Sequence, residues 1–469
     1  MDPFVVVGGD AAGLSAASKL KREAPDREVV VFEKGRWVSY AHCGTPYYVK
    51  GEVDSLTDLV SLSPDEVAER DIDLRREHEV VAVDPEDRVV VAEGPAGRVE
   101  QPYGDVLLGT GARARSDPIE GADLFGAFTL HGLPDATAIR AFVDDGFDPE
   151  TAALGPMSPD EFRRHADADP PETAAVIGGG YVGVEMAEAL AAHGIDVHVL
   201  QRGSHLLGGF GAAVGEAVAD ELAAQGVTVH TDTAVEAIEG EGRVERVAFE
   251  GGALDAGAAI VGVGIAPNTA LAEDAGADLG PSGAVAVDRY GRTSVEGVYA
   301  AGDCAESRHV VSGEATWVPL GLTANRAGRA IGATLGGDPT PVGGVAGTAV
   351  VKAFDLGAGR TGFVSESAAR EAGFDPVSET ITAGSRSGYY PGAEETTVTL
   401  TADRGTGRVL GASVVGRDRA AKRIDTVATA LGSDTTVAEM ERLDLAYAPP
   451  FSPVWDPILV AAKVLRDRV

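Results

Sequence analysis

The sequence predicts an α/β fold with two Rossmann-like dinucleotide-binding domains, followed by a C-terminal α+β domain. Two glycine-rich segments each follow a short apolar run and open a helical pattern, which is the arrangement of a βαβ dinucleotide-binding unit. After about residue 346 the pattern changes to strand-like runs that end in a helix. A chain of 469 residues is also too long for one hydrophobic core, so it divides into two or three domains.

The first predicted unit covers the N-terminal part of the chain. It consists of an apolar strand at residues 4–7, the turn Gly8–Gly13, a helix to about Glu23 and a second strand at 29–33. The glycines let the backbone approach a diphosphate at the helix N-terminus, and Glu33 is placed to accept hydrogen bonds from a ribose. Asp10 stands where the second glycine of G-x-G-x-x-G belongs, which is the one departure from the motif.

The second predicted unit has the complete motif. A strand at 174–177 leads into Gly178–Gly183, and a helix to about residue 193 leads to a strand at 196–200. After the second strand, an acid usually binds the free ribose hydroxyls of NADH, whereas an arginine binds the 2′-phosphate of NADPH. This chain has Gln201 and Arg202 there and no acid. We therefore expect NADPH to be preferred and NADH to work less well.

Cys43 is one of only two cysteines in the chain. A lone free cysteine is commonly a buried small hydrophobic residue. Its neighbours favour a reactive thiol instead, because the segment from Ser39 to Tyr48 combines polar-tipped side chains with an irregular backbone at Gly44 and Pro46. The segment follows closely on the strand that ends in Glu33, so a thiol there can reach a bound cofactor.

The Ser39–Tyr48 segment resembles the S-[FY]-x-x-C-G-x-P-Y sequence of the single-cysteine branch of the pyridine nucleotide-disulfide oxidoreductases, most closely the coenzyme A disulfide reductases. Residues 103–112, 293–303 and 320–329 resemble three further motifs of that family, and Thr293–Asp303 is the most specific of them. Family members with two cysteines carry the second one where this chain has Tyr48. The resemblance therefore implies that the second sulfur comes from the substrate.

The resemblance also implies three domains and a homodimer. We expect an FAD-binding domain at residues 1–113 and 285–345, an NAD(P)H-binding domain at 114–284 and a dimerisation domain at 346–469. Within the second domain, residues 142–171 are rich in Asp and Pro, which predicts a solvated insertion.

The site residues are carried over from the family's motifs. FAD is expected to contact Gly8, Ala12, Gly13, Glu33, Val81, Thr110, Gly111 and Asp303. NADPH is expected to contact Gly178, Gly180, Val182, Gly183 and Arg202. The substrate is expected to contact Ser15, Lys19, Arg22, Ser39, His42 and Asn325. Cys43 is the expected redox residue, assisted by Tyr389 and Tyr447 of the opposite subunit, whereas Cys304 is expected to be structural. No metal site is expected.

The implied reaction is the NADPH-dependent reduction of coenzyme A disulfide to two thiols, in which hydride passes to FAD and electrons pass on to sulfur at Cys43. A mixed disulfide on Cys43 is the expected intermediate, and its thiol is expected to have a depressed pKa. Three alternatives stay open. They are an NAD(P)H oxidase or peroxidase with a Cys43 sulfenic acid, a polysulfide or persulfide reductase, and a non-catalytic flavoprotein that reports redox state.

The net charge is −34, from 73 acidic and 39 basic residues. So acidic a surface excludes nucleic acid as a partner, and it predicts a protein of a salt-rich, halophilic cytosol. No apolar run is long enough to span a membrane, and the N-terminus enters a strand without a basic leader. The expected location is therefore cytoplasmic.

Overall fold

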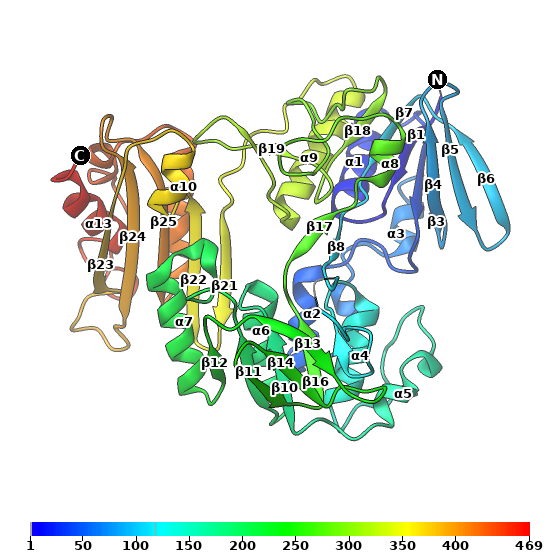
Figure 1. The fold of residues 1–469 in the computed structure, drawn as a ribbon. Coiled ribbons are helices and arrows are strands. Elements are labelled where there is room, and N and C mark those ends of the chain that lie inside the picture. The colour runs from blue at the N-terminus through cyan, green and yellow to red at the C-terminus, as the bar shows by residue number, and fades with distance from the viewer. Residues whose placement is uncertain (1, 118) are drawn as a thin grey trace.

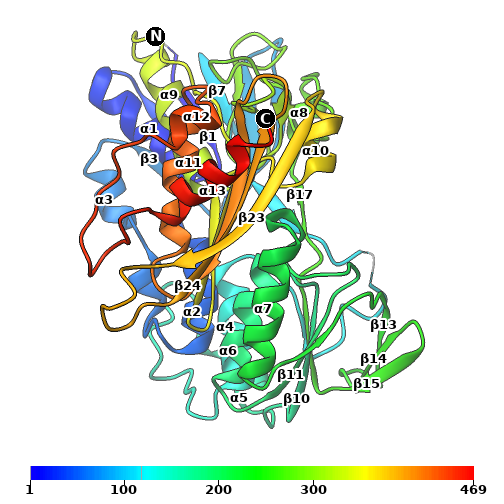
Figure 2. The same ribbon diagram turned by 90° about the vertical axis from the view of Figure 1, so that its left-hand side faces the viewer.

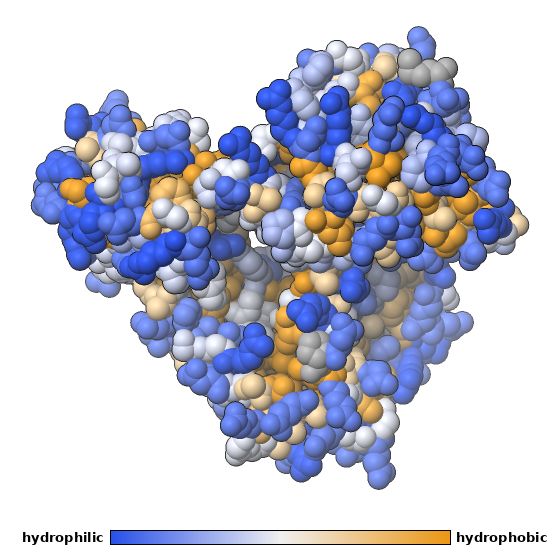
Figure 3. Space-filling view, turned by 45° about the horizontal axis from the view of Figure 1, so that its top comes forward, coloured by the Kyte–Doolittle hydropathy of each residue, from blue (hydrophilic) through white to orange (hydrophobic). Residues whose placement is uncertain are grey.

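The computed structural model describes residues 2–117 and 119–469. The chain forms three domains, seen in Figure 1 at the upper right (first), at the bottom (second) and at the left (third). The space-filling view shows a hollow between the three lobes (Figure 3). The first and second domains each contain a parallel sheet, and the third contains an antiparallel sheet.

The first domain is built on a five-stranded parallel sheet in the order β18-β7-β1-β2-β3. Its strands are β1 (Phe4–Val7), β2 (Val29–Glu33), β3 (Asp73–Arg76), β7 (Asp105–Leu108) and β18 (Val298–Ala300). Alternate residues of β1 face opposite sides. Phe4 and Val6 pack towards helices α1 (Ala11–Glu23) and α9 (Gly321–Leu335). Val5 and Val7 pack towards a three-stranded antiparallel sheet, whose strands are β4 (Glu79–Asp84), β5 (Val89–Gly94) and β6 (Gly97–Pro102).

Glycines allow α9 to lie close against α1. A Cβ atom on Gly328 would come 2.1 Å from the backbone oxygen of Ala12, and one on Gly332 would come 2.4 Å from that of Ala16. Larger residues at these two positions would push the helices apart. The close contact ties the N-terminal dinucleotide helix to a segment about 300 residues later in the chain.

The second domain repeats the arrangement with the strand order β12-β11-β10-β16-β9. Its strands are β9 (Ala127–Phe128), β10 (Thr173–Ile177), β11 (Asp196–Leu200), β12 (Thr228–His230) and β16 (Ala258–Val261). Helices α4 (Leu133–Val143), α6 (Tyr181–Ala191) and α7 (Ala212–Ala224) share one core with Val176 of β10. On the other face, Ile177 packs with the sheet formed by β13 (Val235–Glu239), β14 (Arg246–Phe249) and β15 (Gly252–Asp255).

Two short strands, β8 (Ala112–Ala114) and β17 (Ile265–Pro267), pair antiparallel where the chain passes between the first two domains. After β17, helix α8 (Ala270–Asp274) already packs with the first domain, because Ala272 and Ala275 share a core with Val5 of β1. The chain therefore returns to the first domain earlier than the predicted residue 285. The alanine-rich sequence of α8 carries no nucleotide motif that could have marked this return.

The segment 142–171 differs from the predicted solvated insertion. It contains helix α5 (Arg163–Ala166), and three of its apolar side chains, Leu154, Met157 and Phe162, are 5%, 6% and 4% exposed. They join the core of the second domain beside α4. The sequence hides this burial because single apolar residues stand apart among acids and prolines without a regular period.

The third domain has an antiparallel sheet in the order β21-β22-β25-β24-β23. Its strands are β21 (Ala349–Ala353), β22 (Leu356–Gly362), β23 (Pro376–Gly384), β24 (Glu395–Asp403) and β25 (Val409–Gly416). Its helices are α10 (Glu366–Glu371), α11 (Ile424–Leu431), α12 (Val437–Met440) and α13 (Pro457–Arg466). Helices α11, α12 and α13 share a core with this sheet and lie beside it in the turned view (Figure 2). Strand β21 continues into the core of the second domain through Val351, so these two domains pack directly.

Candidate active site

The first glycine loop has the shape that a dinucleotide diphosphate requires. Gly8 has a φ of +105°, and a Cβ atom there would lie 2.1 Å from the backbone oxygen of Gly109. A Cβ on Gly13 would lie 1.9 Å from the oxygen of Gly8. The loop therefore tolerates no side chain at these two predicted positions and brings bare backbone to the start of α1, beside Ala12.

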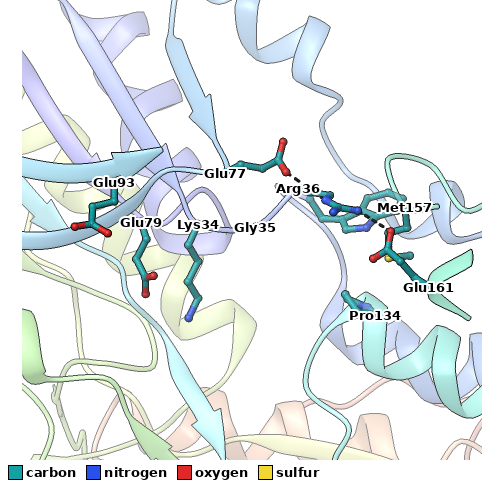
Figure 4. A pocket seen from close by; sticks show the side chains of 10 residues that line it. Lys34, Gly35, Arg36, Glu77, Glu79, Glu93, Pro134, Met157 and Glu161 are labelled. Atoms are coloured by element: carbon teal, nitrogen blue, oxygen red, sulfur yellow. Dashed lines mark hydrogen bonds and ion pairs between the residues drawn. The ribbon is translucent and has the colours of Figure 1, made fainter. Parts of the chain in front are cut away.

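Glu33 lies at the end of β2, where the predicted ribose contact was placed. Its carboxylate accepts hydrogen bonds from the amides of Gly9 at 2.9 Å and Gly35 at 2.6 Å. These bonds hold the acid at the mouth of the glycine loop. A groove continues from there between Lys34, Arg36, Glu79 and Glu161 (Figure 4).

The segment predicted as an insertion borders this groove. Glu161 forms an ion pair with Arg36 at 2.8 Å, and Met157 also lines the groove (Figure 4). A Cβ atom on Gly155 would lie 2.3 Å from the indole ring of Trp37. The segment therefore links the second domain to the chain that follows Glu33, a role that sequence composition did not indicate.

Three other predicted FAD residues lie at a β-bulge or in a hydrogen-bonded turn. Val81 is the extra residue where the pairing of β4 with β5 shifts register, and such a residue leaves its backbone groups unpaired. The Thr110 hydroxyl donates to the backbone oxygen of Asn268 at 2.6 Å. The backbone amide of Asn268 donates to the backbone oxygen of Gly111 at 3.0 Å. These bonds fix the turn at the crossover between the first two domains.

Cys43 lies in a 3-10 turn, His42–Gly44, directly before helix α2 (Thr45–Lys50). The residue is exposed. Ser39 starts this segment in the left-handed region, with a φ of +49°, and its amide donates to the oxygen of Gly9 at 3.0 Å. The backbone thus carries the thiol from the first glycine loop to the start of a helix that packs on the second domain.

Helix α2 contacts α6 through two polar pairs. The Tyr47 hydroxyl donates to the Glu185 carboxylate at 3.0 Å, and the Lys50 ammonium donates to Glu188 at 2.6 Å. Burial raises the pKa of Glu185 to about 7, with Tyr47 opposing and Glu188 adding to that rise. Sequence reasoning missed both glutamates, although their spacing of three on α6 matches the spacing of Tyr47 and Lys50 on α2.

The surroundings of Cys43 in this chain raise its pKa, whereas the sequence predicted a lowered one. Loss of solvent around the thiol raises the pKa of Cys43, and the negative charges of Glu185 and Asp303 raise it further. Burial also raises the pKa of Asp303, while the charge of His42 acts in the opposite direction. Loss of solvent is therefore the main physical reason for the difference, and the acidic side chains around the thiol add to it.

Cys304 has a different environment. It is fully buried in the core of the first domain, and its thiol donates to the backbone oxygens of Leu108 at 3.3 Å and Ala301 at 3.4 Å. Burial raises the pKa of this thiol. The structure supports the predicted packing role and leaves Cys43 as the accessible thiol of the chain.

The second glycine loop repeats the geometry of the first. A Cβ on Gly178 would lie 2.4 Å from the oxygen of Gly262, and one on Gly183 would lie 1.8 Å from the oxygen of Gly178. Gly180 and Val182 belong to the same turn and the first residues of α6. The carboxamide of Gln201 accepts from the amide of Gly179 at 2.9 Å, as Glu33 does from Gly9 in the first loop.

Arg202 follows Gln201 and is exposed. Its guanidinium is therefore available beside the loop, where the sequence predicts contact with the ribose or 2′-phosphate of a nicotinamide cofactor. The parallel between Gln201 and Glu33 shows that a neutral amide replaces the usual acid without loss of the local hydrogen bond.

Four of the six predicted substrate residues gather on one surface of the first domain. Ser15, Lys19 and Arg22 share a face of α1 because they are four and three residues apart. The Ser15 hydroxyl donates to the Asn325 carboxamide of α9 at 2.6 Å, and Lys19 pairs with Glu23. The two helices thus form one polar surface with two cationic side chains. His42 instead pairs with Asp10, the residue before α1.

The two predicted catalytic tyrosines lie in the third domain, apart from the Cys43 segment of the same chain. Tyr389 is 77% exposed and Tyr447 is 49% exposed. Other large apolar side chains of this domain are also exposed, namely Tyr390, Leu443, Phe451, Val454 and Trp455. Contiguous exposed apolar side chains mark protein interfaces, and these seven side chains all belong to the third domain.

Glu188 joins all three domains. Its side chain is 5% exposed and contacts Lys50 of α2, Lys352 of β21 at 2.9 Å and the backbone amide of Phe354 at 2.6 Å. Burial alone would raise the pKa of Glu188, but these partners together lower it. The carboxylate therefore stays charged at the point where the Cys43 helix, the second glycine loop's helix and the third domain meet.

Comparison with known proteins identifies the family. Residues 2–327 match the model of the pyridine nucleotide-disulphide oxidoreductases, and residues 348–457 match the model of the dimerisation domain of these enzymes. The chain belongs to this family. It is an FAD-dependent NAD(P)H oxidoreductase, and the predicted fold class is confirmed. The two glycine loops, which accommodate only backbone at their closest points, fit the two dinucleotides that the family binds.

Several known proteins resemble the whole chain. The NAD(P)H coenzyme A polysulfide/persulfide reductase of Pyrococcus horikoshii is 39% identical over 465 residues, which cover 98% of each protein. The coenzyme A disulfide reductase of Staphylococcus haemolyticus is 29% identical over 472 residues, which cover 100% of each. The structure of a NAD-dependent persulfide reductase from A. fulgidus superposes with a TM-score of 0.91 at 35% identity, covering 99% of this chain and 83% of that one.

Within residues 2–117 and 119–469, no helix combines the length and the apolar character that a membrane crossing requires. In the same ranges, no group of three or more His, Cys, Asp or Glu side chains is arranged to hold a metal ion.

Proposed function

We propose that this oxidoreductase cleaves the S–S bond of a coenzyme A disulfide with electrons from NAD(P)H, and that Cys43 is its nucleophile. The observation that carries the proposal is the contrast between the two thiols. Cys43 is exposed between the two dinucleotide-binding domains, whereas Cys304 is buried in a core. Since the described residues offer no second accessible thiol, the partner sulfur of Cys43 comes from the substrate.

The proposed reaction begins at the thiolate of Cys43. It attacks one sulfur of the substrate disulfide, so that a Cys43 mixed disulfide forms and the other half of the substrate leaves as a thiolate. When bound, FAD and NAD(P)H supply the hydride and the electron pair. Those two electrons cleave the mixed disulfide, which restores the Cys43 thiolate and frees the second thiol after protonation. Lys19 and Arg22 supply positive charge for the phosphates of coenzyme A.

A persulfide or polysulfide of coenzyme A is the second candidate substrate. The relatives at 39% and 35% identity carry that activity in their names, whereas the disulfide reductase relative is 29% identical. The same attack by Cys43 on a coenzyme A persulfide would release hydrogen sulfide instead of a second coenzyme A thiol. The two substrates therefore use one site and differ in the leaving group.

The proposed assembly is a homodimer. The exposed apolar side chains of the third domain need a partner surface, and a two-fold contact would bring Tyr389 and Tyr447 to the opposite subunit's Cys43.

The proposed nicotinamide preference is NADPH, because exposed Arg202 can pair with the 2′-phosphate. The proposed setting is a salt-rich cytosol, which the net charge of −34 supports.

The test is the substitution Cys43→Ser in the FAD-loaded protein. We expect the variant to lose disulfide reduction. It should still bind FAD, and the visible absorbance of its flavin should still decrease when NADPH is added. Steady-state NADPH oxidation with coenzyme A disulfide and with coenzyme A persulfide, compared as kcat/KM, ranks the substrates. Full disulfide reductase activity in Cys43→Ser would refute the proposal.

A further inference from the structure

Asp10 has an unusual role at the start of helix α1. An Asp at this first position normally accepts hydrogen bonds from the free amides of the first helical turn. Asp10 has the required extended backbone, with φ −120° and ψ −150°, yet its side chain makes no capping bond to the helix in the part of the chain that the structure describes. The first-turn amides thus remain available to another anion.

The carboxylate of Asp10 pairs with His42 instead. Asp10 Oδ2 lies 2.5 Å from His42 Nε2, and His42 Nδ1 lies 2.8 Å from the backbone oxygen of His131. A backbone carbonyl only accepts, and so does an ionised carboxylate, so each ring nitrogen must carry a proton. The two contacts therefore favour the imidazolium form of His42, whose ring stacks on that of Tyr40 with the centroids 4.2 Å apart.

The charges around His42 agree with this state. Burial alone would lower the pKa of His42, but Asp10, the His131 carbonyl and the charge of Asp303 together raise it. His131, whose ring centroid lies 5.7 Å away, has its pKa lowered by burial and by His42. Burial and the nearby carboxylates raise the pKa of Tyr40, so it stays neutral. His42 is thus the histidine of this cluster whose charged form its neighbours favour.

We propose that His42 keeps the FAD diphosphate site clear by holding the Asp10 carboxylate away from the first turn of α1 and cancelling its charge. Asp10 replaces a glycine of the dinucleotide motif, so a negative side chain stands in the loop that receives a diphosphate. Released from His42, this carboxylate would bind the same amides and repel the same ligand. His42 is then a positioning residue for the FAD loop rather than the predicted coenzyme A contact.

The test is a double-mutant comparison of FAD affinity. Apoprotein is titrated with FAD at pH 6.5, and the dissociation constant is read from flavin fluorescence. We expect His42→Gln to weaken FAD roughly tenfold, as misplaced charge at a helix N-terminus does. We expect Asp10→Gly to bind like wild type, and Asp10→Gly combined with His42→Gln to recover within about threefold of it, since the competing carboxylate is gone.

The matched control is His198→Gln, because His198 also faces a carboxylate, Asp196 at 3.5 Å, but lies in the second sheet. It should leave FAD affinity unchanged. A double variant that binds FAD as weakly as His42→Gln would overturn the proposal, because the defect would then not pass through Asp10. An unchanged dissociation constant in folded His42→Gln would overturn it as well.

A second measurement uses the wild-type protein and so does not depend on folding of a variant. FAD binding needs Asp10 held by protonated His42, so the FAD-bound state favours protonation of His42, and FAD affinity falls as pH rises through the pKa of this side chain. The dissociation constant of wild type should therefore increase as the pH is raised from slightly acidic to alkaline values, and that of Asp10→Gly should change much less. Equal pH dependence in the two proteins contradicts the inference.

Discussion

The Glu188 junction predicts that one uncharged substitution will loosen the contact between all three domains. Glu188→Gln keeps the shape of the side chain and one oxygen that can accept from the amide of Phe354. It removes the charge that Lys50 and Lys352 contact at 2.6 Å and 2.9 Å. The free energy of unfolding should therefore fall through the loss of two ion pairs.

The magnitude follows from the exposure of the two lysines. The side chain of Lys50 is 19% exposed, so its contact is a partly buried charge-assisted hydrogen bond, which contributes about 1.5–3 kcal/mol. The side chain of Lys352 is 44% exposed, so screening by solvent limits its pair to below about 1 kcal/mol. We expect Glu188→Gln to lower the free energy of unfolding by about 2–4 kcal/mol at pH 7.

The assay is urea unfolding at pH 7, followed by tryptophan fluorescence and taken from the first transition, since three domains need not unfold together. Glu216→Gln, an exposed acid on α7, is the matched control. The pKa of Glu188 is lowered on folding, so its contribution is present above its unfolded pKa and is lost as pH falls through the folded one. The difference from wild type should shrink at acidic pH. A loss below about 0.5 kcal/mol at pH 7 would refute the reasoning.

Three further substitutions and one condition have expected outcomes. Cys304→Ser should keep most reductase activity, because only Cys43 is exposed, and loss of most activity would assign Cys304 a redox role. Arg202→Ala should raise KM for NADPH more than for NADH, and equal changes would place the arginine outside the phosphate site. Glu185→Gln should move the pH profile of Cys43 alkylation to lower pH, because the Glu185 charge raises the pKa of that thiol; an unmoved profile contradicts this. Flavin retention should increase from low to molar KCl as screening shortens the Debye length to roughly 3 Å, and no change contradicts the salt-adapted reading.

The parts of the fold that were predictable are those with complete local patterns. Strand β1, helix α1 and strand β2 have the predicted bounds, because an apolar run, a glycine turn and an amphipathic helix follow one another within 30 residues. Strand β11 also has its predicted bounds, and β10 begins one residue before its predicted start. The return of the chain to the first domain was misplaced because α8 has no such pattern and is positioned by tertiary packing.

The candidate site was predictable at motif residues and not at their partners. The glycine loops, Cys43 and the cationic face of α1 stand in local motifs. Glu188 could not be found in this way, since it lies 138 residues from Lys50 and 164 from Lys352 in sequence. The pairing of Asp10 with His42 was equally hidden, because each residue was interpreted within its own motif and the contact forms only when both segments meet at the start of α1.

The two helices that meet at these contacts connect the cofactor loops to the thiol. Helix α6 begins at the second glycine loop and presents Glu185 and Glu188 to α2, which begins just after Cys43. A shift of α6 on nucleotide binding would therefore move two side chains that hold α2, and one of them also raises the pKa of Cys43. Since Glu188 also binds Lys352, the same shift would reach β21 of the dimerisation domain. These contacts thus link the helix that follows the second glycine loop to the helix that follows Cys43 and to the third domain.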